Sequence, residues 1–271
     1  MSIFYPVKAD DPIFENAEYV RDKVHFNVLD TRIRSAAAIL LTNGSTIIMG
    51  QSNPAMSMWI WTSERVTSED LFALKTALPQ ILSASEVPFF MARESVTDCL
   101  QGAFAPRPVI FEERLTSYKC ENLLIPTAKG EIDYPSAEDM SELVEFLIGF
   151  QQECFDMTPS ADEMQVRIQA YIDNKSAFVL KDNGVPQSMA AFGVPEYGYI
   201  KIGPVFTAKT ARNHGYAAYL TARVCEHITA QGCTPILYAD SMNPASNKAY
   251  QNIGFVSAGT LKGFKIGMGE Q

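Results

Sequence analysis

Two stretches hold the side chains best suited to chemistry, "ARNHGYA" at residues 211–217 and "DSMNPASNKAYQNIGF" at residues 240–255. In the first, a strand-like run ends and a helical pattern begins. The first turn of a helix carries unpaired N–H groups and a partial positive charge, so it binds phosphate where small residues leave it open. A nearby arginine suits a pyrophosphate or a 3′-phosphate. We therefore predict a phosphate cradle at residues 212–217, formed by Arg212, Asn213, His214, Gly215, Tyr216 and Ala217.

The second stretch places polar side chains on one face of a short helix. Asn243, Asn247 and Tyr250 are spaced four and three residues apart, and Ser246 lies one turn before Tyr250. Both stretches follow a strand, so both helix starts can face the same edge of a sheet, where ligands usually bind. Each also has a simpler interpretation, namely an ordinary helix start with an exposed arginine and a solvated polar face. Together they favour a ligand site.

The elements that must position these residues form an α/β layered domain over residues 130–271. Asn183 and Gly184 between two apolar runs predict a hairpin. Asn243 and Pro244 predict a helix start, with asparagine as cap and proline at the first position. The remaining predicted elements are a strand near residue 131, helices capped by Ser136 and over 161–172, a strand ending near Thr207, a helix over 211–230, a strand at 234–240 and closing strands after Gly254.

Residues 1–122 predict a separate α/β domain whose element order resembles that of the second half. Its elements are a hairpin at Asn43–Gly44, a strand with both tryptophans, a helix capped by Ser68, and two further strands around a helix. No residue-level repeat accompanies this order. Because no glycine occurs between Gly50 and Gly102, this half cannot offer the same open helix start. We expect it to be non-catalytic.

Composition narrows the function further. The 271 residues carry a formal net charge of −9, which argues against nucleic-acid binding and favours cationic partners such as amines. The five cysteines and three histidines show no metal-ligand spacing, so we expect no metal site. The N-terminus is not typical of a signal peptide, and the aliphatic run at 36–41 is too short to cross a membrane. We expect a cytoplasmic protein with reduced thiols; the sequence leaves its oligomeric state open.

The segment "GPVFTAKTARNHGYAAYLTARV", followed by "YADSMNPASNKAYQNIGF", resembles the GNAT superfamily of acetyl-CoA-dependent N-acetyltransferases. The first part is similar to its phosphate-binding motif, Arg/Gln-x-x-Gly-x-Gly/Ala, and the second to its asparagine-to-tyrosine helix and closing Gly-Phe. The resemblance covers residues 130–271, and the similar element order of residues 1–122 predicts a tandem GNAT-like protein with a degenerate N-terminal domain. It implies a mixed, mostly antiparallel sheet flanked by helices, with acetyl-CoA as acetyl donor and an amine as acceptor.

The resemblance also implies roles for individual residues. The strand end formed by Val205, Phe206 and Thr207 would separate from its neighbour and pair with the pantetheine arm. The phosphate cradle would bind the pyrophosphate, and Asn243, Ser246 and Asn247 would contact the rest of the cofactor. Tyr250 would protonate the departing thiolate. We take Glu196 as the candidate base, directly or through a water, although a solvated loop acid is the simpler interpretation.

Three functions from different classes fit these patterns. The leading hypothesis is an N-acetyltransferase acting on an amine. The alternative is an acyl-CoA-binding sensor or interaction module without turnover. A generic nucleotide-binding α/β protein explains the helix starts but not the polar face with Tyr250. The acceptor stays open among small amines, polyamines, aminoglycosides, amino acids and protein lysines or N-termini.

Overall fold

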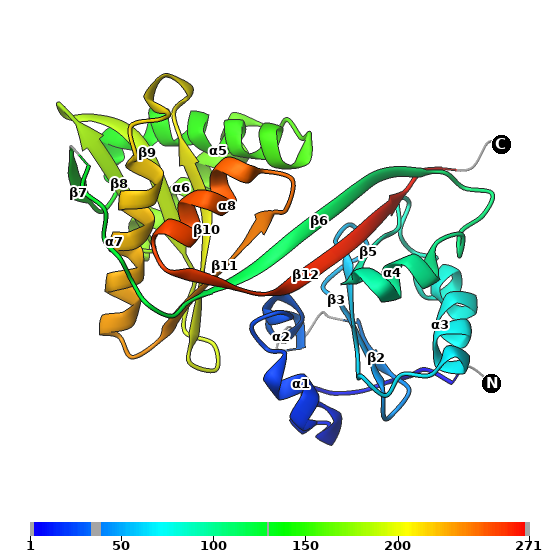
Figure 1. The fold of residues 1–271 in the computed structure, drawn as a ribbon. Coiled ribbons are helices and arrows are strands. Elements are labelled where there is room, and N and C mark those ends of the chain that lie inside the picture. Colours follow the sequence, from blue (N-terminus) through cyan, green and yellow to red (C-terminus); the bar gives the residue numbers. More distant parts are fainter. Residues whose placement is uncertain (1–2, 34–38, 129, 269–271) are drawn as a thin grey trace. The chain divides into compact units, whose positions relative to one another are not determined.

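The computed structural model describes residues 3–33, 39–128 and 130–268. Contacts divide the chain into one unit of residues 1–117 with 258–271 and a second unit of residues 118–257. In the first unit the strands lie in the order β1-β2-β3-β4-β5-β12, and in the second unit in the order β11-β10-β9-β8-β7; Figure 1 shows the fold. Most neighbours are antiparallel, as predicted; β4 with β5 and β10 with β11 are parallel. No helix of the described ranges is long and apolar enough to span a membrane.

The second unit contains the predicted strands and helices in the predicted order. Its elements are β7 (Glu131–Asp133), α5 (Met140–Phe155), α6 (Ala161–Asp173), β8 (Ala177–Asp182), β9 (Val185–Phe192), β10 (Tyr199–Thr207), α7 (Tyr216–Ala230), β11 (Thr234–Asp240) and α8 (Pro244–Asn252), with 3-10 turns at Ala137–Asp139 and Lys209–Ala211. In Figure 1, α7 covers one face of β8–β10, and α5 and α6 cover the other.

Alternating side chains on the central strands produce this sandwich. On β9, Ala190 and Phe192 pack in the cluster that contains the buried face of α7. Met189 and Ala191 pack in the cluster that contains α5 and α6. Successive side chains of a strand point to opposite faces, so a continuous apolar run fits a strand covered on both sides.

Local capping patterns place the helix starts. The capping box of Ser136 and Asp139, the hairpin at Asn183–Gly184 and the Asn243 cap are all confirmed. The prediction that a helix starts at Ala211 was wrong. Residues Lys209–Ala211 form a 3-10 turn, and α7 begins at Tyr216 because Gly215 has a left-handed φ of +78° that no α-helix continues through.

The first unit has the same element order as the second. Its elements are β1 (Tyr5–Pro6), α1 (Ala17–Arg21), α2 (Asn27–Ile33), β2 (Ile39–Thr42), β3 (Ile47–Gln51), β4 (Met58–Thr62), α3 (Ser68–Ile81), β5 (Phe89–Arg93), α4 (Glu94–Leu100) and β6 (Val109–Cys120), with a 3-10 turn at Pro12–Glu15. The sequence patterns missed α1 and α2, which are only five and seven residues long. They also misplaced the cap of α3, which is Thr67 rather than Ser68.

The last strand, β12 (Phe255–Ile266), carries the end of the chain into the first unit. Its residues Leu261–Lys265 pair antiparallel with Arg93–Phe89 of β5. Residues 258–268 therefore belong with the first unit, whereas the sequence patterns placed them in a domain of residues 130–271. The alternation of apolar residues along a strand specifies which of its faces is buried, but not which strand it pairs with. The pairing of β12 with β5 therefore could not be predicted from the sequence.

Candidate functional site

The site begins where β10 separates from β11. These strands pair in parallel only from Tyr199 to Lys201, opposite Thr234–Ile236. With β9, by contrast, β10 stays paired as far as Thr207, across a register shift between Ile202 and Val205. Beyond Lys201, the edge of β10 that faces β11 therefore has no strand partner among the described residues.

The pairing of β10 with β9 shows which backbone N–H and C=O groups of β10 point to the open edge. The N–H of Ala208 donates to the carbonyl of Gln187, on the β9 side. Because successive residues of a strand alternate in direction, the N–H and C=O groups of Val205 and Thr207 point to the open side. An extended ligand chain can bind there as an added strand does.

The phosphate cradle lies at the end of this open edge. Gly215 is the N-cap of α7, and no side chain caps this helix. No protein group within the described ranges accepts a hydrogen bond from the backbone N–H of Gly215, Tyr216 or Ala217. A Cβ added at Gly215 would meet nothing within 4 Å, and the first turn holds no acidic residue. The amides are thus open to an anion.

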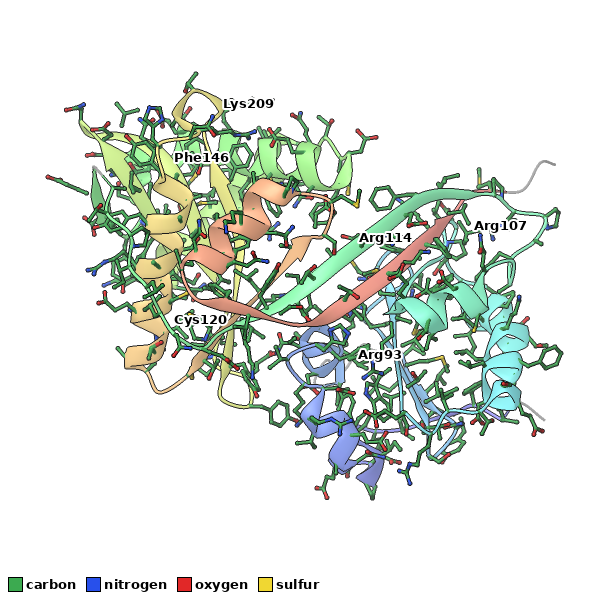
Figure 2. The ribbon with its side chains drawn as sticks, viewed as in Figure 1. Arg93, Arg107, Arg114, Cys120, Phe146 and Lys209 are labelled. Atoms are coloured by element: carbon green, nitrogen blue, oxygen red, sulfur yellow. The ribbon has the colours of Figure 1, made fainter. Side chains whose placement is uncertain are left out.

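The side chain of Arg212 points to α5 instead of into open solvent. Its Nη2 donates to both carboxylate oxygens of Glu153, at 2.9 and 2.8 Å, and its Nε lies 3.3 Å from the carbonyl oxygen of Thr207. The guanidinium carbon lies 5.4 Å from the centre of the Phe206 ring. Arg212 therefore ties together the end of α5, the end of β10 and the loop of the cradle. Figure 2 labels Lys209 just before this loop.

Two aromatic side chains brace the same loop. His214 Nδ1 lies 2.9 Å from the carbonyl oxygen of Arg212, and its ring stacks on that of Tyr216 at 5.6 Å. The hydroxyl of Tyr216 donates to Asp182 at 2.9 Å, and this bond raises the pKa of the phenol. Because the side chains of His214 and Tyr216 contact other protein groups, the backbone N–H groups of the cradle are what it offers to a ligand.

The polar face of α8 is largely occupied by bonds within the protein. The Asn243 side chain accepts from the N–H of Ser246 at 3.0 Å and so caps the helix. Both amide hydrogens of Asn247 are used, since its Nδ2 donates at 2.7 Å to the carbonyls of Asp240 and Asn243. Its Oδ1 accepts from the hydroxyl of Tyr118 at 2.8 Å. Ser246 is half-buried on the same turn.

Tyr250, at the other end of this face, is half-buried between aromatic rings. Its ring centre lies 6.4 Å from that of Tyr118 and 5.9 Å from that of Phe255. Within the described ranges, its hydroxyl has no hydrogen-bond partner in the protein. Burial raises the pKa of this phenol, and the neighbouring thiols of Cys154 and Cys225 act in the same direction. Tyr250 therefore stays protonated.

Glu196 lies apart from these residues. It forms a bridge with Tyr199, in the turn that precedes β10. Val205 is six residues beyond Tyr199, about 20 Å along an extended strand. A base must reach the reacting amine directly or through one water, and the role of Glu196 as that base stays a prediction.

Sequence patterns missed two residues that shape the site, Tyr118 and Glu153. Their partners Asn247 and Arg212 are 129 and 59 residues away in sequence. No local spacing connects such pairs. Nor does any group of three or more His, Cys, Asp or Glu side chains in the part of the chain that the structure describes have the geometry to hold a metal ion.

The corresponding helix of the first unit, α3, starts in the opposite way. Thr67 accepts from the N–H of Asp70 at 3.1 Å, and Asp70 accepts from the N–H of Thr67 at 3.0 Å. Glu69 and Asp70 also bring negative charge into the first turn. This helix start is closed by its own side chains and disfavours an anion.

Comparisons with known proteins agree with this architecture. Residues 182–261, which include the cradle and α8, match the family model described as FR47-like protein. A GCN5-related N-acetyltransferase from Sphaerobacter thermophilus superposes with a TM-score of 0.66 at 13% identity, over 98% of this chain and 96% of that one. A GNAT-family acetyltransferase from Colwellia psychrerythraea gives 0.58 at 14% identity, over 97% and 99%.

A Drosophila protein of solved structure gives a TM-score of 0.67 at 11% identity, over 98% of this chain and 99% of its own. A search of curated protein sequences finds no match. The structural similarity extends over both units, so the element order repeated in the first unit is part of the same architecture. The chain thus has the fold of the GNAT acetyltransferases over its whole length, with an FR47-like domain at residues 182–261.

Proposed function

We propose that this protein is an acetyl-CoA-dependent N-acetyltransferase that transfers the acetyl group to a primary amine by direct attack in a ternary complex. One observation carries the proposal: the open edge of β10 leads directly into the uncapped start of α7. An extended pantetheine arm pairs with the backbone of Val205 and Thr207. The pyrophosphate at its end then reaches the free amides of Gly215, Tyr216 and Ala217.

Tyr250 supplies the general acid in this proposal. The amine nitrogen attacks the thioester carbonyl and forms the C–N bond, the C–S bond breaks, and the phenol gives its proton to the departing sulfur. Free thiols have a pKa of about 8.5 and phenols of about 10, so the proton moves in concert with bond cleavage. The burial that raises the pKa of Tyr250 keeps it protonated for this step.

The amine class of the acceptor rests on charge. The formal net charge of −9 attracts cationic substrates. A sensor that binds acyl-CoA without turnover is the second candidate. The side chains of Asn243 and Asn247 favour this sensor function, because they already form hydrogen bonds within the protein. Such bonds make the site rigid, as a binding site without turnover requires.

A release assay separates the two candidates. The protein is incubated with acetyl-CoA, a thiol-reactive chromophore and a panel comprising a polyamine, an aminoglycoside, free amino acids and a lysine-containing peptide. Release of free CoA faster than the blank with at least one amine, and loss of that release in Tyr250→Phe, supports the enzyme. Tight acetyl-CoA binding by calorimetry with no release from any amine supports the sensor.

A further inference from the structure

Helix α8 carries Tyr250 but contributes no buried residue to the core. Most helices of a globular protein are held by an apolar face packed on a core. For α8, directional hydrogen bonds must therefore take a larger share of that task. These bonds fix the position of the Tyr250 hydroxyl together with the contacts of its half-buried ring to Tyr118 and Phe255.

The bonds at the start of α8 converge on Asn247. Its Nδ2 ties α8 to the carbonyl of Asp240 at the end of β11. Its Oδ1 is held by the Tyr118 hydroxyl at 2.8 Å. Tyr118 itself is only 3% exposed, near the end of β6, so its hydroxyl is a rigid donor. Gln251 Nε2, one turn further along α8, lies 3.5 Å from the same hydroxyl.

The chain after Tyr118 holds the other end of α8. Cys120, labelled at the end of β6 in Figure 2, has its sulfur 3.9 Å from the carbonyl oxygen of Ile253. The N–H groups of Glu121 and Leu124 donate to the carbonyls of Gly254 and Ile253, at 3.2 and 3.1 Å. The segment 118–124 therefore contacts α8 near both of its ends, with Tyr250 between them.

We infer that Tyr118 is a positioning residue for acetyl transfer: its hydroxyl fixes Asn247, and through it the helix that presents Tyr250. Tyr118 does not bond to Tyr250 and acts through the placement of α8. The inference rests on the proposed function in one respect, the role of Tyr250 as acid. Tyr118 is the first residue of the second unit, so the inference concerns that unit alone.

The test compares Tyr118→Phe, Tyr250→Phe and the double variant in the full-length protein. Tyr118→Phe keeps the ring beside Tyr250 and removes one hydrogen bond. We expect the single-turnover rate with the most reactive amine of the panel to fall about 2- to 10-fold, with an unchanged KM for acetyl-CoA. Added to Tyr250→Phe, the same change should cost less than about twofold, because the acid it positions is already gone. Tyr171→Phe, which removes another bonded hydroxyl of the second unit, is the matched control and should leave the rate unchanged.

Hydrogen exchange of the backbone amides provides a readout independent of turnover. In Tyr118→Phe, the amides of residues 245–252 in α8 should exchange about 2- to 10-fold faster, while those of α5 and α7 keep the wild-type rate. A uniform increase in all three helices, or full additivity of the two rate losses, would show a merely structural role and overturn the inference. So would unchanged exchange in α8. If Tyr250→Phe keeps the wild-type rate, the proposed acid is wrong, yet selective loosening of α8 still supports Tyr118 as the residue that positions this helix.

Discussion

Arg212 donates from one guanidinium nitrogen to both carboxylate oxygens of Glu153, at 2.9 and 2.8 Å. Both side chains are roughly two-fifths exposed, at 41% and 36%. Such a pair contributes little to stability, about 0–1 kcal/mol. Its larger effect is electrostatic, because Glu153 places a negative charge beside the cradle that we propose for a pyrophosphate.

Replacing Glu153 by glutamine should therefore strengthen the binding of acetyl-CoA. We expect the Kd from calorimetry to fall about two- to fivefold at low salt and the gain to shrink toward 0.5 M salt, as surface charges are screened. Glu142→Gln removes the same charge from the first turn of α5, at the other end of that helix, and should leave the Kd unchanged. Weaker binding in Glu153→Gln would instead mean that the clamp on Arg212 shapes the cradle.

Gly215→Glu should weaken acetyl-CoA binding by more than tenfold, about 1.4 kcal/mol or more. The new side chain would bring bulk and negative charge to the open amides. Any residue with a Cβ is also strained at φ +78°, by about 1–2 kcal/mol.

Gly232→Glu provides the control for this strain. Gly232 has a φ of +74° and equally open surroundings, and lies just beyond the other end of α7. Both variants should lose similar stability, but only Gly215→Glu should lose affinity. Equal affinity in the two folded variants would show that the cradle lies elsewhere.

The protein should bind one acetyl-CoA per chain. The start of α3 in the first unit is closed by the Thr67–Asp70 capping box and carries acidic residues, so it cannot repeat the cradle of α7. Calorimetric titration measures the stoichiometry directly. A second site of comparable affinity would contradict this assignment.

Tyr250→Phe should lower the rate of acetyl transfer by about 10²–10⁴-fold, with little change in the KM for acetyl-CoA. The ring and its contacts remain, so only the proton donor is lost. Single-turnover kinetics measures the chemical step even where product release limits kcat. An unchanged single-turnover rate would show that Tyr250 lines the site without donating a proton.

The raised pKa of Tyr250 predicts how the transfer rate depends on pH. Burial raises the pKa of Tyr250 above the ordinary value of about 10, so its neutral form persists where an exposed phenol ionises. The transfer rate should therefore show no alkaline decline between pH 8 and about pH 10. A decline in this range that disappears in Tyr250→Phe would contradict the raised pKa.

The first unit should lose stability as the pH falls below 6.5. Burial lowers the pKa of His25 from its ordinary value of 6.5 to about 4. Below pH 6.5 this histidine therefore binds a proton in the unfolded chain but stays neutral in the folded chain, which favours unfolding. The loss should reach about 3 kcal/mol near pH 4, at 1.36 kcal/mol per unit of pKa. Both tryptophans of the chain lie in β4, so their fluorescence in urea titrations reports this unit. Carboxylates titrate in the same range, but only the histidine contribution should vanish in His25→Gln.

The sequence alone determined the local features of this protein. Asn183–Gly184 specifies a tight hairpin, and Ser136 with Asp139 a capping box. Asn243 with Pro244 specifies a helix start. These features depend on residues a few positions apart, whose backbone preferences act in any context. The GNAT fold was predicted from the resemblance of residues 203–224 and 238–255 to that family's motifs.

Only the tertiary structure decided where the polar side chains of the site are directed. Arg212 turns to Glu153 and Asn247 to Tyr118, across 59 and 129 residues. Glu196 is placed at the far end of β10, and β12 pairs with β5 of the first unit. A side chain bonds to whichever group packing brings within about 3 Å, and packing follows from the order of strands in the sheet. Because that order joins segments far apart in the chain, no local pattern contains it.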